Sequence, residues 1–271
     1  MGSSRISPGE ALQSRTQRVF LSPGPRPLSN GGNFMEYNID NDIRQIRREL
    51  IALADFSYAA FQARLIPDVP ADKIIGVRTP ALRKYTQRIK HTHFADSFLS
   101  TLPHEYYDEN NLHGFLLEDI KNPDVLIEEL DRFLPYIDNW ATCDSVRPQI
   151  IKKYPEKFLP KIYEWMDSDH TYTVRYAIGL LNSFYLDTQY ADEAMEAVSK
   201  KCCDRYYVNM MIAWFFSTAL TKDYNAAVKY LEDRRLTPWV HNMTIQKAND
   251  SLQILTAKKE YLSSLKIALT D

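Results

Sequence analysis

The sequence has few of the residues that mark several common protein classes. It contains three cysteines, two of them adjacent at Cys202 and Cys203, and no Cys-x-x-Cys pair. This usage excludes a disulfide-built scaffold and predicts reduced thiols in a cytoplasmic location. No run of 18 apolar residues occurs, which excludes a membrane-spanning helix. The formal net charge is only -2, so affinity for a polyanion must come from local basic patches.

Glycine is scarce beyond the first 34 residues. Five of the eight glycines lie in that segment, and only Gly76, Gly114 and Gly179 follow it. A β-sheet protein needs many glycine-bearing hairpin turns. The body of the chain is therefore predicted to be helical.

Residues 1–34 differ in composition from the rest of the chain. They hold four arginines, one acid, six serines and four prolines, which predicts a disordered leader, with residues 35–271 forming a single domain. The composition fits a transit peptide. Because Met35 stands directly before the first periodic stretch, it fits an upstream extension equally well.

Apolar periodicity and helix-start signals divide the remaining residues into helices. Ile39, Ile43, Ile46 and Leu50 form one amphipathic stripe, and this stretch is predicted to run on to Leu65. Thr79-Pro80, Asn122-Pro123 and Thr237-Pro238 each predict a capped helix start. Further helices are predicted near residues 80–90, 105–119, 123–136, 139–153, 155–167, 171–186, 190–201, 205–220, 224–234 and 238–255.

This many short helices with short connections predicts a stack of helix pairs. The first two of the proline starts are 43 residues apart, close to the period of HEAT-like repeats at about 40 to 47 residues. A compact orthogonal bundle is the alternative.

Charge is segregated along the chain. Residues 73–90 hold six basic residues and no acid, whereas residues 105–131 hold nine acids and only Lys121. A second basic patch covers residues 147–161. Together these segments predict a basic face that follows a phosphate backbone, the alternative being ordinary solvated helix faces. The candidate DNA-binding residues are Arg78, Arg83, Lys84, Arg88, Lys152 and Lys153.

Trp140 and Asp144 are candidates for chemistry because they are four residues apart and share one face of a helix. An indole beside a carboxylate attracts a cation. Pro148 either kinks that helix or starts the next one. The structural alternative is a core tryptophan with a capping aspartate.

Arg175 and Trp214 each stand out in their surroundings. Arg175 is the single charge of an otherwise uncharged helix, which predicts either a phosphate ligand or a buried partner of an acid such as Asp144. Trp214 lies in the uncharged stretch of residues 206–221, so the pattern favours the centre of a buried helix over a binding role.

The sequence offers no metal or nucleotide site. His91-x-His93 lacks a further ligand at suitable spacing, and no glycine-rich phosphate loop or Gly-x-Ser-x-Gly elbow occurs. No cofactor is therefore expected.

Four segments resemble, in order and spacing, the AlkD-like DNA alkylation repair proteins. They are Ile75-Gly76-Val77-Arg78-Thr79-Pro80-Ala81-Leu82-Arg83, Asn139-Trp140-x-x-x-Asp144-Ser145, Val174-Arg175-Tyr176-Ala177-Ile178 and Ile212-Ala213-Trp214. The resemblance covers roughly residues 45 to 255.

The resemblance implies an all-α, HEAT-like helical-repeat solenoid of antiparallel helix pairs that holds duplex DNA on a basic face. It implies a DNA glycosylase that removes cationic alkylpurines without metal or cofactor. By motif, Asp144 is the catalytic carboxylate, Trp140 and Trp214 are aromatic walls at the lesion, and Arg175 contacts DNA or orients another group.

Three functions follow from these observations. The first is a monomeric, cytoplasmic, monofunctional DNA glycosylase acting on double-stranded DNA. The second is a non-catalytic binder of DNA structure on the same fold, because fold alone does not fix activity. The third is a helical-repeat scaffold whose aromatic residues are all core and whose partner is a protein.

Overall fold

Most helices of this computed structural model begin where the sequence supplies a polar cap or a proline. The structure describes residues 38–201 and 203–268, within the unit Tyr37–Asp271. Side chains that accept a first-turn backbone N–H belong to Asn38, Asp55, Asn122, Asn139, His170 and Asp223. Each of these bonds satisfies a donor that has no partner inside its helix.

In the described part of the chain, 14 α-helices and three short 3₁₀ helices form, and no strand. The α-helices are α1 (Ile39–Ile51), α2 (Phe56–Leu65), α3 (Thr79–Ile89), α4 (His93–Ser100), α5 (Tyr107–Leu117), α6 (Pro123–Phe133), α7 (Trp140–Ser145), α8 (Pro155–Met166), α9 (Thr171–Phe184), α10 (Ala191–Ser199), α11 (Tyr206–Lys222), α12 (Tyr224–Glu232), α13 (Pro238–Asp250) and α14 (Thr256–Ser264). The 3₁₀ helices are η1 (Ala71–Lys73), η2 (Leu134–Tyr136) and η3 (Gln149–Lys153).

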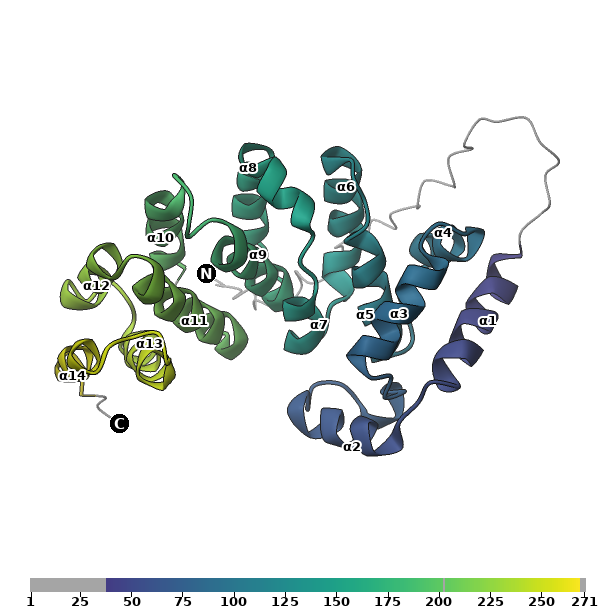
Figure 1. The fold of residues 1–271 in the computed structure, drawn as a ribbon, viewed down its shortest axis with the longest axis horizontal. Helices are drawn as coiled ribbons and strands as arrows, with labels where there is room; N and C mark the ends of the chain where they lie inside the picture. Colours follow the sequence, from purple (N-terminus) through teal and green to yellow (C-terminus); the bar gives the residue numbers. More distant parts are fainter. Residues whose placement is uncertain (1–37, 202, 269–271) are drawn as a thin grey trace, which may run out of the picture. The chain divides into compact units, whose positions relative to one another are not determined.

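From α3 onward the helices form two layers (Figure 1). In the first layer, α3, α5, α7, α9, α11 and α13 contact one another in that order. In the second layer, α4, α6, α8, α10, α12 and α14 each pack against a helix of the first. This is an all-α helical-repeat fold of HEAT-like helix pairs, as the sequence predicts.

The repeat is shorter than the 43-residue interval suggested. That interval joins α3 of the first layer to α6 of the second, so it compares helices that are not equivalent. The first-layer helices α5, α7, α9, α11 and α13 begin at residues 107, 140, 171, 206 and 238, which gives a repeat of 31 to 35 residues.

Several predicted boundaries were wrong. The first stretch does not run on to Leu65 as one helix, because Asp55 caps a new helix, α2. Helices α4 and α14 were not predicted at all. Pro148 ends the expected 139–153 helix, so α7 stops at Ser145 and the 3₁₀ helix η3 follows. Thr79 is the first residue inside α3 and not its cap, and Thr237 stands at the N-cap of α13 without a side-chain capping bond.

Three apolar clusters hold the helices together. The largest extends from Leu117 to Leu262 and joins both layers, and a second joins α1, α3, α4 and α5. The third is small: Ile66, Val69, Ile74 and Tyr107 pack together, with Trp140 against them. The chain after α2 is therefore anchored on the first turns of α5 and α7. The predicted leader, residues 1–34, lies outside the described residues.

Candidate functional site

Asp144 and Arg175 face each other between α7 and α9. Arg175 Nε donates to Asp144 Oδ1 at 2.9 Å, and Arg175 Nη2 donates to Asp144 Oδ2 at 2.6 Å. A third donor, Arg175 Nη1, reaches the backbone oxygen of Tyr207 on α11 at 2.8 Å. The side chain of Arg175 is 5% exposed and that of Asp144 is 13% exposed. The pair is a buried, two-pronged ion pair that joins three neighbouring first-layer helices.

This geometry decides between the structural interpretations of the two residues. Asp144 is not a capping residue, because Asn139 caps the start of α7 and Asp144 lies in its last turn. The interpretation of Arg175 as a buried partner of Asp144 is confirmed. Burial lowers the pKa of Arg175, but the hydrogen bonds and charge of Asp144 outweigh burial and raise it overall.

Trp140 is the first residue of α7, one turn from Asp144. Its half-buried ring packs against the small cluster of Ile66, Val69 and Ile74. Its indole Nε1 donates to the backbone oxygen of Leu65 at 3.0 Å. One edge of the ring is therefore fixed by the end of α2.

Trp214 contradicts the expectation that it fills the centre of a buried helix. It is 43% exposed on α11, whereas Ala213, Phe215 and Phe216 beside it are buried. Among the described contacts, none joins Trp214 to Trp140, Asp144 or Arg175. The ring of Trp214 is therefore accessible to solvent on a first-layer helix.

Sequence reasoning missed a tyrosine pair and an aspartate beside Arg175. The rings of Tyr172 and Tyr207 are 5.5 Å apart between α9 and α11. Tyr172 Oη donates to Asp68 Oδ2 at 2.8 Å. Burial and this contact raise the pKa of Tyr172, and burial with the charge of Asp68 raises that of Tyr207. The Asp68–Tyr172 pair and the Asp144–Arg175 pair meet at Tyr207, whose ring packs on Tyr172 and whose backbone oxygen accepts from Arg175, and together they form one polar cluster.

The aromatic residues of this region had a detectable signal in the sequence. Tyr107, Trp140, Tyr172, Tyr207 and Trp239 each occupy the first or second position of a first-layer helix. They recur at spacings of 33, 32, 35 and 32 residues. A search for repeats near 33 residues reveals this series, whereas a search for HEAT-length repeats misses it.

Three of the candidate DNA-binding arginines are held by acids. The ion pairs are Arg78 with Asp55 at 2.8 Å, Arg83 with Glu118 at 2.8 Å and Arg88 with Glu49 at 2.6 Å. The basic segment 73–90 thus pairs partly with the acidic segment 105–131. Arg83 also donates to the backbone oxygen of Ser145 at 3.2 Å, which brings it next to Asp144.

The candidate lysines are freer than these arginines. Lys84, Lys152 and Lys153 are exposed, and within the described ranges none of them forms an ion pair. The remainder of the second basic patch behaves differently. Lys157 and Lys161 of α8 pair with Asp124 and Asp131 of α6, so they belong to the second layer.

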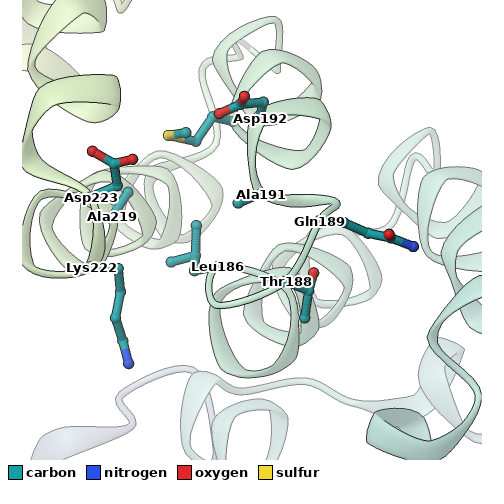
Figure 2. Close-up of a pocket in the computed structure, with 9 residues that line it drawn as sticks. Leu186, Thr188, Gln189, Ala191, Asp192, Ala219, Lys222 and Asp223 are labelled. Carbon is teal, nitrogen blue, oxygen red and sulfur yellow. The ribbon is translucent and has the colours of Figure 1, made fainter.

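The described cavities lie away from this cluster. The cavity in Figure 2, about 290 Å³, lies between the ends of α9 and α11 and the starts of α10 and α12. Its lining includes Asp192, Lys222 and Asp223, and none of the candidate site residues. Within residues 38–201 and 203–268, no group of three histidine, cysteine or acidic side chains is arranged to hold a metal. No helix of the described part is long and apolar enough to span a membrane.

Comparison with known proteins places the chain in a family. No curated protein matches the sequence. A family model described as DNA alkylation repair enzyme matches residues 46–249, which include Asp68, Trp140, Asp144, Arg175 and Trp214. The match covers well over half of the chain, and it agrees in extent with the helical repeats. The chain therefore belongs to the DNA alkylation repair enzyme family.

Proposed function

We propose that this protein is a monofunctional DNA glycosylase that hydrolyses the N-glycosidic bond of cationic alkylpurines in duplex DNA. The family supports a role in DNA repair. The observation that carries the finer proposal is the Asp144 carboxylate, which Arg175 fixes in one orientation beside Trp140.

Asp144 keeps capacity for a ligand while it is held. An ionised carboxylate has about four lone-pair positions. Arg175 occupies two of them, and no other nitrogen or hydroxyl donor reaches Asp144 among the described residues. The side chain retains 13% exposure. The remaining positions are available to a water molecule or to the electron-poor carbon of a sugar.

The chemistry of the leaving group matches this simple site. An alkylated purine is already positively charged, so its departure from the sugar needs little acid catalysis. A nearby carboxylate stabilises the oxocarbenium charge that develops on the sugar and orients the attacking water. The indole of Trp140 and the exposed ring of Trp214 supply aromatic surface for the cationic base.

Contact with the DNA backbone is assigned to the cationic side chains described above. Lys84, Lys152 and Lys153 are available to phosphates without losing an ion pair. Arg78, Arg83 and Arg88 are exposed, and each exchanges its half-buried carboxylate partner for a phosphate.

Base release tests the proposal directly. Duplex DNA treated with a methylating agent is incubated with the protein, and free methylpurines and abasic sites are measured against a protein-free control. We expect methylpurine release with an intact sugar-phosphate backbone, because no lyase group is invoked. Duplex binding without release above the control contradicts the proposal.

A second candidate function is recognition of DNA without catalysis. The neutralisation of Asp144 by Arg175 favours it, because a paired carboxylate exerts a weaker field on a developing positive charge. The same base-release measurement separates the two functions.

A further inference from the structure

The segment after α2 places a carboxylate against a helix that is distant in sequence. Asp68 is exposed, yet its Oδ2 accepts a hydrogen bond from the hydroxyl of Tyr172, 104 residues further along the chain. Tyr172 is itself 7% exposed. A buried tyrosine therefore holds the carboxylate in place while its charge stays open to solvent.

Asp68 carries the uncompensated charge of the polar cluster. Asp144 is neutralised by two bonds from Arg175. In the described part of the chain, no basic side chain forms an ion pair with Asp68. A positively charged ligand that reaches the cluster is thus attracted more strongly by Asp68 than by Asp144.

The surroundings of Asp68 suit a flat cation. The ring of Tyr172 packs on that of Tyr207, with 5.5 Å between their centres, and because Tyr172 is buried, Tyr207 supplies the accessible aromatic surface beside Asp68. Three residues before Asp68, the backbone oxygen of Leu65 receives the indole N–H of Trp140. The carboxylate therefore belongs to the same end of the first layer as the predicted lesion site, and aromatic faces add to its attraction for a cation.

We propose that Asp68, oriented by Tyr172 and flanked by Tyr207, forms a subsite that recognises the positive charge of an alkylated purine. The inference rests on the proposed function and adds to it the residue that distinguishes a charged base from a neutral one. In this proposal Asp144 stabilises the positive charge that develops on the sugar, and Asp68 attracts the positive charge of the base.

The test compares two duplexes that differ only in the charge of one base. The first carries a 7-methylguanine whose sugar bears a 2′-fluorine, which slows cleavage. The second carries 7-deaza-7-methylguanine on the same fluorinated sugar, which has the same shape and no positive charge. We expect the intact protein to bind the charged duplex more tightly. Asp68→Asn should reduce that preference about fivefold and leave affinity for the neutral duplex unchanged.

Two further variants separate recognition from general electrostatics. Asp72→Asn removes an equally exposed charge four residues away, in η1, and should leave the preference intact. Tyr172→Phe keeps the ring but removes the hydrogen bond, so it should lower the preference in the same direction as Asp68→Asn. Thermal unfolding of each variant checks that the fold is retained.

The outcomes distinguish this inference from the proposed function. A full preference for the charged duplex in Asp68→Asn, or an equal loss in Asp72→Asn, overturns the subsite. An intact protein with no preference overturns it as well. If the protein releases base and Asp68→Asn keeps the full preference for the charged duplex, the glycosylase proposal is supported and the subsite is not. Loss of preference in Asp68→Asn, in a protein that releases no base, supports the subsite and contradicts catalysis.

Discussion

The protein has two carboxylates that each bind an arginine with both oxygens. One lies among the first helices and the other in the middle of the chain, and they differ in whether a further ligand can reach them. In the first, Arg47 of α1 contacts both oxygens of Glu109 on α5, at 2.7 and 3.2 Å. Glu109 is 0% exposed and also accepts the backbone N–H groups of Glu105 and Tyr106. In the second, Asp144 has the two bonds from Arg175 and retains 13% exposure.

The difference separates a carboxylate that only holds the fold together from one that has room for a ligand. Four donors reach Glu109, three of them at Oε2, and its complete burial leaves no position open to a ligand. Two donors leave Asp144 half satisfied at an opening to solvent. Burial and an arginine partner are common to both residues. The spare lone pairs of Asp144 are what distinguish it.

The largest expected effect is on stability, at the saturated pair. Glu109→Gln keeps the shape and the helix cap but removes the charge that compensates Arg47. We expect the free energy of unfolding to fall by about 3 kcal/mol, the lower end for a broken buried pair, because Arg47 is 29% exposed and keeps Glu105. Urea unfolding measures the change. A loss below about 1 kcal/mol would show that Glu109 is less important than its contacts indicate.

Acidification should weaken the same region. Burial, with a smaller effect from the charge of Arg47, lowers the pKa of His104 to about 3. Below the ordinary histidine pKa near 6.5, the unfolded chain binds a proton that the folded chain rejects. The contribution of neutral His104 to the free energy of unfolding is therefore fully present above pH 6.5. It falls as the pH drops toward 3, by about 2 kcal/mol at pH 5.

Urea unfolding at pH 7 and pH 5 tests this prediction. His104→Phe keeps a ring against Phe98, 4.2 Å away, and removes the titrating group. Its loss of stability between the two pH values should be smaller than that of the unmodified protein. Equal losses would assign the pH dependence to other groups.

The smallest effect is expected from the lysines that have no acidic partner. Replacing Lys84, Lys152 and Lys153 by glutamine should flatten the plot of log affinity for duplex DNA against log salt concentration. The slope should change by about one unit for each phosphate that the variant no longer binds. Lys157→Gln with Lys161→Gln is the matched control, because these lysines already pair with α6. An unchanged slope in the triple variant would place its lysines away from DNA.

Much of the fold could be predicted from local signals. The scarcity of glycine and the 3.6-residue periodicity indicate helices, and Asn122 and Asn139 cap the helices expected after them. The break before α2 was missed because Asp55 is a single capping residue inside an apolar stretch. The length of the helix that begins at Trp140 was not predictable, because Pro148 could either kink that helix or start the next one.

The site was less predictable, because its contacts join segments distant in sequence. The pattern singled out Asp144 and Arg175 and offered their pairing as one alternative, but whether they meet across 31 residues depends on how α7 packs on α9. The exposure of Trp214 was missed because an uncharged stretch indicates burial. Asp68 is a single acid between two prolines, and only its contact with Tyr172 reveals it.

The central claim is that the unsaturated carboxylate acts in catalysis and the saturated one does not. Its most direct test is base release from methylated duplex DNA by Asp144→Asn, at a temperature where the variant is fully folded. We predict a fall on the order of a hundredfold, the usual effect of losing one preorganised charge, with duplex affinity nearly unchanged. Glu109→Gln, measured under the same folded condition, should release base at the normal rate. Full activity of a folded Asp144→Asn protein would contradict the account.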